Sequence, residues 1–409
     1  MEMNELLNEL YSYSLHGIKL GLENIQKICD SLGNPEKNYK IVHITGTNGK
    51  GSTATIVETV LLKQGYKVGK YTSPHILKFN ERIRVNGQDI SDEDITKVYG
   101  IVREKIKELG ITPTFFEVTT AMMFLYFSMK EVEYVVLEVG MGGRFDATNV
   151  VDSDIAIITN VSIDHTEYLG KTIYEIAREK AGIIKDKSYV IVGDSNPEFL
   201  KAIVEKKKDY TNVLEKYKNI DYKLDFKNFV TDIEIDDKKY KLSLFGDYQV
   251  KNFLCAYEAL KRLGISDEVI IDAVKEVKWQ CRFEIYKNEP LTVLEGAHNI
   301  DGMSNLRKII KQGYKKNEVV LIVSILKDKK IDEMLEICED MSDKIILTSL
   351  SENPRGLNGA SIYEHSNKSS IYEVCEDMKK SYEIAKSFGR KVIVVCGSFY
   401  TCEKFKKEV

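Results

Sequence analysis

The chain shows two hydrophobic patterns that alternate along most of its length. Short runs of apolar and β-branched residues are typical of buried strands in a parallel sheet, and apolar residues at every third or fourth position are typical of amphipathic helices. The runs predict strands at residues 40–45, 134–139, 155–159 and 189–192, and the spaced pattern predicts helices within residues 1–35 and at 52–64 and 174–184. Strands that alternate with helices indicate an α/β domain with a mostly parallel sheet.

The segment 222–244 has a different pattern. Ile233, Ile235 and Tyr240 alternate with polar residues, and the acidic pair at 236–237 predicts a turn between them. A period of two residues is typical of a strand with one face exposed. We therefore expect an antiparallel hairpin on the surface of the α/β body.

Beyond residue 284 the alternation of strands and helices starts again. Strands are predicted at residues 291–294, 319–323, 344–348 and 392–396, and helices at 302–311, 331–338 and 371–387. This order predicts a second, smaller α/β domain of the Rossmann-like type. The polar segment 287–290 is interpreted as a linker, so we expect one domain at residues 1–286 and a second at 287–409.

Composition and charge narrow the class of protein. The 409 residues include 59 Lys and Arg against 63 Asp and Glu, which gives a formal net charge of −4. Binding to nucleic acid or to an anionic membrane requires a basic excess, so neither partner is expected. We expect no signal peptide and no membrane span, because no apolar run approaches roughly 18–20 residues. The seven cysteines are never spaced C-x-x-C, which favours free thiols in a reducing cytoplasm.

The strongest candidate for chemistry is the segment GTNGKGS at residues 46–52, between a predicted strand and a predicted helix. Glycines let backbone amides approach phosphate oxygens, Lys50 supplies a positive charge, and the Ser52 hydroxyl can bind Mg²⁺. The segment departs from the common G-x-x-x-x-G-K-[ST] form, because Ile44 stands in the place of the first glycine and Gly51 separates Lys50 from Ser52. The alternative is a flexible glycine turn, and the flanking strand and helix argue against it.

Polar side chains also follow the strands predicted at 134–139 and 155–159. Glu138 lies at the end of the first strand, and His165 lies in the segment beyond the second. The carboxyl ends of parallel strands meet at one edge of a sheet, so a carboxylate there is well placed for Mg²⁺. Taken singly, Glu138 could be a solvated acid, His165 a structural histidine, and Lys180, in the next predicted helix, an exposed lysine.

Eight motifs in this order resemble those of folylpolyglutamate synthase and dihydrofolate synthase, which are members of the Mur ligase superfamily. They extend over nearly the whole chain and read GTNGKGS, TSPH followed by ERI, EVGMGGRFDATN, IDHTEYLG, REKAGI, WQCRFE, EGAHN and PRG. The resemblance implies a P-loop ATPase domain with a mostly parallel sheet, followed by a smaller Rossmann-like α/β domain. It also implies an ATP-dependent amide ligase, in which ATP phosphorylates a folate carboxylate and the amine of L-glutamate displaces the phosphate.

The resemblance further implies which residues act. ATP would be bound by Gly46, Thr47, Asn48, Gly49, Lys50, Gly51, Ser52, Thr53, Asn252, Arg282, Glu295 and His298. Two Mg²⁺ ions would be held by Ser52, Glu138, His165 and a carbamylated Lys180. Lys50, Lys180, His165 and Arg282 would be catalytic, and the folate would be bound by Ser73, Pro74, His75, Thr114, Phe116 and Asp146. The implied partners are ATP, folate or dihydropteroate, and L-glutamate, and the protein is expected to be a monomer.

Three positions depart from the family pattern. Tyr248 stands where members commonly have His, Glu295 where they have Asp, and Gln280-Cys281 where they have Pro-Gly before Arg282. Tyr248 cannot act as an imidazole. The extra methylene of Glu295 changes any ribose or metal contact inferred for that position.

Several alternatives can be weighed on the sequence. A regulatory P-loop GTPase is disfavoured because the chain has no N-K-x-D motif. A cell-wall Mur ligase would carry a further domain ahead of the P-loop, and 45 residues before Gly46 are too short for one. A non-catalytic nucleotide-binding protein would require decayed motifs. A folylpolyglutamate synthase without dihydrofolate synthase activity, and another Mur-type amino-acid ligase, stay open beside the bifunctional enzyme.

Overall fold

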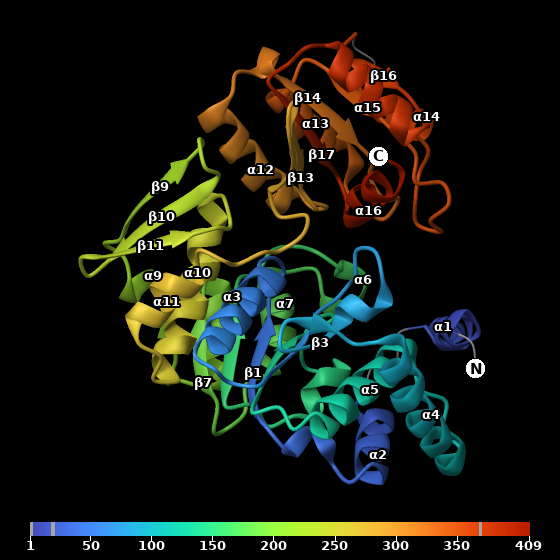
Figure 1. Ribbon diagram of the computed structural model, residues 1–409, viewed down its shortest axis with the longest axis vertical. Coiled ribbons are helices and arrows are strands. Elements are labelled where there is room, and N and C mark those ends of the chain that lie inside the picture. The colour runs from blue at the N-terminus through green and yellow to red at the C-terminus, as the bar shows by residue number, and fades with distance from the viewer. Residues whose placement is uncertain (1–2, 18–20, 368–369) are drawn as a thin grey trace. The chain divides into compact units, whose positions relative to one another are not determined.

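The computed structural model describes residues 3–17, 21–367 and 370–409 (Figure 1). The chain packs into two compact units. The first comprises Met1–Asp221, Ile233–Lys241 and Val250–Val277, and the second comprises Tyr222–Asp232, Leu242–Gln249 and Lys278–Val409. The domain boundary predicted between residues 286 and 287 stays a prediction.

The first unit contains an eight-stranded sheet in the order β4-β3-β2-β5-β1-β6-β7-β8. Its strands are β1 (Lys40–Thr45), β2 (Val68–Tyr71), β3 (Ile83–Val85), β4 (Gln88–Asp89), β5 (Tyr134–Glu138), β6 (Ile155–Ile158), β7 (Tyr189–Val192) and β8 (Thr211–Asn212). β1 lies parallel between β5 and β6, with Ile44 opposite Glu138 and Thr45 opposite Ile158. The three strands therefore end at one edge of the sheet, which is where ligands bind in open parallel sheets.

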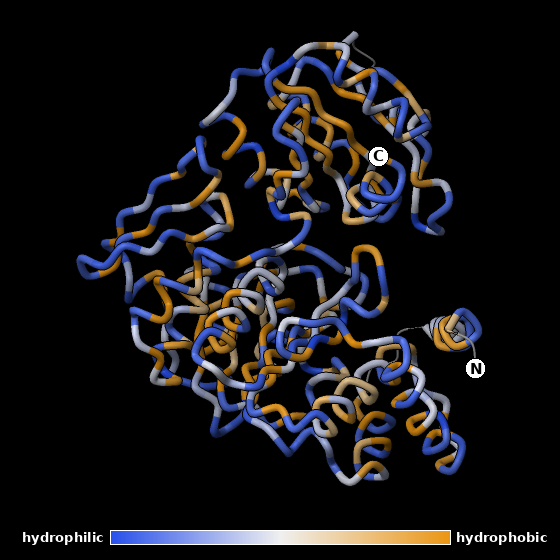
Figure 2. The backbone as a smooth tube through the Cα atoms, viewed as in Figure 1, coloured by the Kyte–Doolittle hydropathy of each residue, from blue (hydrophilic) through white to orange (hydrophobic). Residues whose placement is uncertain are grey.

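Helices account for most of the remaining first unit. They are α1 (Met3–Ser12), α2 (Glu23–Ser31), α3 (Lys50–Lys63), α4 (Asp92–Leu109), α5 (Phe115–Met129), α6 (Thr166–Leu169), α7 (Ile173–Ala181), α8 (Pro197–Lys206), α9 (Val213–Lys216), α10 (Asp247–Arg262) and α11 (Asp267–Ala273). One apolar core packs α2, α4 and α5 against β2 and β5, and another packs α7 and α8 against β6 and β7. Figure 2 shows apolar residues concentrated along the strands and the helix faces that cover them.

The second unit contains a six-stranded sheet in the order β12-β13-β17-β14-β15-β16. Its strands are β12 (Glu284–Asn288), β13 (Leu291–Leu294), β14 (Val319–Val323), β15 (Ile345–Leu347), β16 (Tyr372–Val374) and β17 (Val392–Cys396). The helices are α12 (Ile300–Gly313), α13 (Ile331–Met341), α14 (Gly359–Glu364), α15 (Met378–Ser387) and α16 (Phe399–Glu408). All strand pairs are parallel except β12 with β13.

The predicted fold class is confirmed, and three details are corrected. Segment 222–244 forms a three-stranded sheet of β9 (Asp221–Asp225), β10 (Val230–Ile235) and β11 (Lys238–Leu242), not a single hairpin. The start of the predicted helix 371–387 is strand β16, because Tyr372–Val374 pairs with β15. Segment 287–290 is not a linker, since Asn288 pairs with Leu291 in the β12–β13 hairpin. Among the residues that the structure describes, no helix is both long and apolar enough to cross a bilayer.

Candidate active site

The P-loop connects β1 to α3 in a conformation that requires two of its glycines. Gly46 and Gly49 have φ values of 154° and 85°. A Cβ at Gly46 would collide with the Thr159 hydroxyl, and one at Gly49 would collide with the Asn252 side chain. α3 begins at Lys50, so the loop amides lie at a helix N-terminus, where an anion is stabilised.

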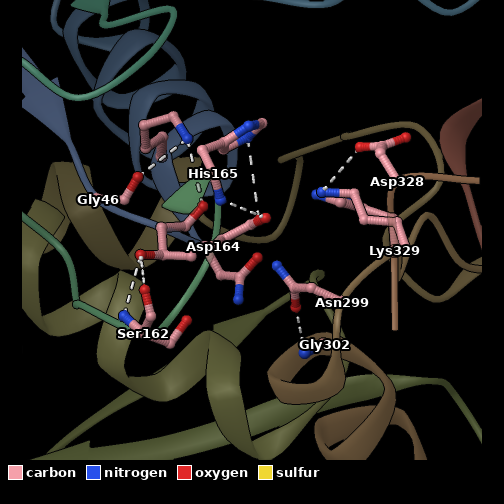
Figure 3. A network of polar contacts seen from close by, with 12 residues as sticks. Gly46, Ser162, Asp164, His165, Asn299, Gly302, Asp328 and Lys329 are labelled. Carbon is pink, nitrogen blue, oxygen red and sulfur yellow. Dashed lines mark hydrogen bonds and ion pairs between the residues drawn. The ribbon is translucent and has the colours of Figure 1, made fainter. Parts of the chain in front are cut away.

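Residues beyond β6 hold the P-loop in place. The Asn48 amide donates to Asn160 Oδ1 at 2.9 Å, and the Thr159 hydroxyl donates to the Asn48 carbonyl at 2.6 Å. The Ser162 amide donates to Thr47 Oγ1 at 3.0 Å (Figure 3). Lys50 Nζ donates to the Gly46 carbonyl at 3.1 Å. The loop therefore has a defined shape, and the interpretation as a flexible turn is wrong.

Ser52 and Glu138 provide two oxygen donors at this edge of the sheet. Ser52 lies in the first turn of α3, and its buried Oγ forms no hydrogen bond with any described residue. Glu138 is the last residue of β5, is 4% exposed, and accepts a hydrogen bond from the Ser73 amide at 3.1 Å. A buried hydroxyl without a partner is normally destabilising, so a ligand for Ser52 is expected. Hydroxyl and carboxylate oxygens suit Mg²⁺.

Lys180 lies near the C-terminus of α7, which begins at a capping box formed by Thr172 and Glu175. Lys180 is 2% exposed, and its amine forms no hydrogen bond or ion pair with a described residue. Burial, followed by the charge of Lys50, lowers the pKa of Lys180 to about 7, while Asp164 opposes the shift. The prediction from sequence alone, an exposed helix lysine, is therefore wrong.

Asp164 and His165 lie between β6 and α6 (Figure 3). His165 adopts a left-handed conformation with φ of 50°, and its amide donates to Asp164 Oδ1 at 2.9 Å. The side chain of His165 is 42% exposed and that of Asp164 is 10% exposed. Asp164 was not predicted as a site residue, although its position after β6 is the same signal that identified His165.

The glycine-rich segment after β5 packs directly on the helix that carries Lys180. The Arg144 amide donates to the Glu179 carbonyl at 2.8 Å, and a Cβ at Gly143 would collide with the carbonyls of Glu179 and Lys180. Only a residue without a side chain permits this close approach. The glycines at this position therefore determine where α7 ends relative to β5.

Asp146, a predicted folate residue, is buried and binds groups of its own segment. Its carboxylate accepts from the Met141 amide at 2.9 Å and from the Thr148 amide and hydroxyl at 3.0 and 2.6 Å. Burial raises its pKa, and these hydrogen bonds oppose the rise. Since the Thr148 hydroxyl donates to Asp146, the buried His43 Nε2 at 2.9 Å donates to Thr148. Burial lowers the pKa of His43 to about 3, so it is neutral.

The predicted folate residues Ser73, Pro74 and His75 lie in the loop between β2 and β3. The peptide bond between Ser73 and Pro74 is cis. Arg82 Nε donates to His75 Nδ1 at 2.8 Å. A guanidinium cannot accept a hydrogen bond, so Nδ1 has no proton and Nε2 bears it. The contact with Arg82 therefore fixes the tautomer of His75, and Arg82, which belongs to the ERI motif, was not predicted as a site residue.

Thr114 and Phe116, also predicted folate residues, lie at the start of α5. Thr114 is the N-cap and forms a capping box with Glu117. The Phe116 ring packs so closely on β5 that a Cβ at Gly140 would collide with it. Thr114 thus has a structural role, and Phe116 is an aromatic ring beside the end of β5.

In the second unit, Arg282 and Glu295 form an ion pair with Nη1 and Oε1 3.5 Å apart. Tyr248 donates from its hydroxyl to Glu295 Oε2 at 3.0 Å. Burial raises the pKa of Glu295, and Arg282 and Tyr248 oppose the rise. Two of the positions that depart from the family pattern, Tyr248 and Glu295, therefore contact each other.

His298 and Asn299 follow β13. His298 Nδ1 is 3.0 Å from the Gly296 carbonyl, and the ring lies 5.5 Å from that of Phe399. Asn299 is the N-cap of α12 and accepts from the Gly302 amide at 2.8 Å (Figure 3). The structure thus brings the predicted site residues together in two groups. One lies in the first unit with the P-loop, Asn252, Glu138, His165 and Lys180, and the other lies in the second unit with Arg282, Glu295 and His298.

The predicted metal ligands are Ser52, Glu138, His165 and Lys180. In the described ranges, no three or more His, Cys, Asp and Glu side chains group as a metal site. The predicted donors fit a magnesium site of a different kind, because Ser52 supplies a buried, unpartnered hydroxyl, and Glu138 a carboxylate. His165 adds a nitrogen donor, and Lys180 has no donor oxygen unless its amine is modified.

The chain is similar to known proteins over nearly its whole length. Residues 44–260 match the Mur ligase middle domain, and residues 281–399 match the Mur ligase glutamate ligase domain. A dihydrofolate synthase/folylpolyglutamate synthase of Bacillus subtilis is 34% identical over 414 aligned positions, which cover 96% of this chain and 96% of that protein. The corresponding Escherichia coli protein is 31% identical and covers 96% of this chain and 92% of its own length.

Solved structures agree with the sequence comparison. Escherichia coli FolC in complex with DHPP and ADP superposes with a TM-score of 0.87 at 29% identity, over 98% of this chain and 97% of that one. A folylpolyglutamate synthase from Thermotoga maritima gives a TM-score of 0.84 at 35% identity, over 99% and 96%. The bifunctional enzyme of Yersinia pestis, complexed with AMPPNP and a Mn ion, gives a TM-score of 0.84 at 27% identity, over 98% of this chain and 97% of that one.

Proposed function

The chain belongs to the dihydrofolate synthase/folylpolyglutamate synthase family of Mur ligases, and we propose on this premise that it is an ATP-dependent ligase that joins L-glutamate to folates. We propose further that it also accepts dihydropteroate. The observation that carries the proposal is the P-loop, whose lysine and buried Ser52 hydroxyl lie at the head of α3. A folylpolyglutamate synthase without the second activity is the alternative.

The reaction requires activation of a carboxylate, because an amine does not displace oxygen from a carboxylate at neutral pH. The carboxylate oxygen attacks the γ-phosphorus of ATP, the bond to the bridging oxygen breaks, and ADP leaves. The glutamate amine then attacks the acyl phosphate carbon, loses a proton, and phosphate leaves. Lys50, the amides of the P-loop and Arg282 stabilise negative charge on the phosphoryl oxygens.

Nucleotide binding is assigned to the other residues of the P-loop and, in addition, to Asn252 and His298. Gly49 packs against Asn252, which connects the loop to α10. Mg²⁺, when bound, would supply positive charge that stabilises the phosphate groups. Ser52, Glu138 and His165 would hold the metal, and a second ion would involve Lys180.

Lys180 is proposed to act as a carbamate. Its neutral amine attacks CO₂, an N–C bond forms as one C–O π bond opens, a proton leaves to water, and the neutral amine becomes an anionic carbamate with two oxygen donors. The support is its burial without a hydrogen-bonding partner beside the like charge of Lys50. A site of this kind favours the neutral amine over the ammonium ion.

A carbon-isotope experiment tests the carbamate directly. The protein is equilibrated with ¹³C-labelled bicarbonate, and the expected result is a carbamate carbonyl signal that is absent in Lys180→Ala. The variant is expected to lose ligase activity and to recover part of it with added short-chain carboxylates. A wild-type protein without the signal, whose activity does not depend on CO₂, would contradict the assignment.

Folate binding is assigned to Ser73, Pro74, His75, Phe116 and Asp146, with Thr114 capping α5 beside them. The fixed Nε2–H of His75 offers a hydrogen-bond donor, and Phe116 offers a ring on which a planar heterocycle can stack. Phe116 lies at the start of α5, residues 73–75 lie in the segment that follows β2, and Asp146 lies in the segment that follows β5.

The decisive experiment measures glutamate-dependent ADP release with dihydropteroate and, separately, with tetrahydrofolate. We expect activity with both. Activity with tetrahydrofolate alone would identify the monofunctional enzyme, and activity with neither would overturn the proposal. We also propose a monomer that works in the cytoplasm, supported by seven cysteines that are all free, and light scattering tests the monomer.

A further inference from the structure

Arg282 lies in a turn in which both neighbouring residues have a left-handed backbone. The φ angle is 54° at Cys281 and 47° at Phe283, a conformation that is unfavourable for a residue other than glycine. Each is held by a hydrogen bond to a carboxylate, from the Cys281 amide to Glu284 Oε2 at 2.8 Å and from the Phe283 amide to Glu295 Oε2 at 2.9 Å. Such conformations persist where surrounding contacts over-determine them, and they gather at functional sites.

Glu295 is the centre of these contacts. Its Oε2 accepts from both the Phe283 amide and the Tyr248 hydroxyl, and its Oε1 is paired with Arg282 Nη1. The carboxylate is 3% exposed. On its own side, the guanidinium of Arg282 lies 4.6 Å from the centre of the Phe399 ring. The guanidinium therefore has a carboxylate and an aromatic face as its two fixed neighbours.

Tyr248 is held firmly enough to orient Glu295. Its ring packs against the apolar core of the second unit, and a Cβ at Gly246 would press on the ring. Burial and the nearby Glu295 carboxylate raise the pKa of Tyr248 well above 10, so the hydroxyl keeps its proton and donates it. Both Glu295 oxygens therefore already interact with groups of the protein.

We infer that Tyr248 and Glu295 are positioning residues for Arg282. Tyr248 holds the Glu295 carboxylate, and that carboxylate holds the guanidinium in the orientation in which it contacts the phosphates of ATP. The inference rests on the proposed function, in which Arg282 binds the nucleotide. Glu295 then acts through Arg282 and not by contacting the nucleotide itself. A displaced guanidinium would lower kcat, because its stabilisation of the negative charge on the phosphates depends on its position.

A double-mutant cycle between Tyr248→Phe and Arg282→Ala tests the inference. Arg282→Ala is expected to lower kcat by about 10²–10³-fold, and Tyr248→Phe by about tenfold or more, with the KM for folate unchanged. In the Arg282→Ala background, Tyr248→Phe should change kcat by less than about twofold, because residues that act through one another are not additive. Glu295→Asp, which shortens the side chain, should resemble Tyr248→Phe.

Tyr240→Phe is the matched control. The Tyr240 hydroxyl also donates to a buried carboxylate, Asp267 Oδ1 at 2.9 Å, but in the first unit. Its ring packs on Phe253 and Tyr257, and within the part of the chain that the structure describes it makes no hydrogen bond or ring contact with Arg282 or Glu295. Tyr240→Phe should lower stability without changing kcat. A kcat loss that is equally large in the Arg282→Ala background would overturn the inference, as would a Tyr248→Phe variant with wild-type kcat.

The same cycle is measured on the Kd of a non-hydrolysable ATP analogue with Mg²⁺, which requires no turnover. If the wild type lacks ligase activity, the proposed function fails, and the coupling in Kd still decides the inference. Coupled losses of affinity would support it. An Arg282→Ala variant that binds the analogue like the wild type, or losses that add independently, would contradict it.

Discussion

The ammonium group of Lys70 lies 2.5 Å from Oε2 of Glu58, and neither side chain reaches solvent. Lys70 belongs to β2 and Glu58 to α3, so the pair joins the helix that begins at the P-loop to the strand that precedes the loop of Ser73. The Thr55 hydroxyl accepts a further hydrogen bond from Lys70 at 3.2 Å. Burial lowers the pKa of Lys70, and Glu58 opposes that shift.

Breaking this pair should destabilise the protein strongly. Lys70→Met leaves the buried Glu58 carboxylate with Arg84 Nη1, 4.0 Å from Oε2, as its remaining cationic neighbour, and should lower the free energy of unfolding by at most about 3–5 kcal/mol. The double variant Lys70→Met with Glu58→Leu should lose much less, because no charge stays buried. Urea denaturation measures both. As a control, Lys63→Met removes a partly exposed pair with Glu276 and should change stability by less than about 1 kcal/mol. A double variant no more stable than Lys70→Met would contradict this account.

Lys50→Met should abolish turnover and leave the fold intact. Its ammonium group lies at the head of α3 and donates to two P-loop carbonyls, Gly46 and Thr47. Losing a charge that stabilises the phosphoryl group should reduce kcat by about 10³-fold. Lys63→Met, in the last turn of the same helix, should keep wild-type kcat in the ADP-release assay. Near-normal turnover by Lys50→Met would count against the P-loop assignment.

Lys180 should make stability depend on pH. Its pKa is about 7 in the folded protein and about 10.4 in an unfolded chain. Between these values the unfolded chain binds more protons, so stability rises with pH across this window. Lys180→Met removes the cost of burying the amine. In CO₂-free buffer at pH 7 the variant should therefore be more stable than wild type, by at most a few kcal/mol. The difference should shrink towards pH 10, as measured by denaturation at several pH values. A gap that does not vary with pH would show that the amine is not desolvated.

Phe116→Leu should weaken folate binding selectively. The ring packs on the backbone at the end of β5, where Gly140 leaves room for it. Replacing an aromatic ring that stacks on a heterocycle should raise the KM for folate by about three- to tenfold, with the KM for ATP unchanged. Phe124→Leu, in the core of the first unit, should reduce stability without changing either KM. Equal changes in both KM values for Phe116→Leu would indicate a structural role.

Local patterns in the sequence predicted the central strands and several helices, whereas the long helices α4, α5 and α10 were not predicted. β1, β7, β13, β14 and β17 have the bounds expected from their apolar runs, because a strand buried on both faces must be apolar along its length. The strands β2, β3, β4, β8, β9, β12 and β16 were not predicted, because they are short and carry polar residues. The P-loop was also recognisable, because its glycines and lysine are adjacent in the chain.

Contacts between residues far apart in the chain could not be predicted in this way. The pairing of Lys70 with Glu58 and of Tyr248 with Glu295 depends on which elements pack together. The burial of Lys180 depends on the close approach of the Gly143 backbone to α7. The sequence alone was sufficient for the central strands, the motifs and the family, because these depend on residue type and spacing. Protonation, partner and orientation of the site side chains depend on burial and on neighbours from other elements, and only packing determines those.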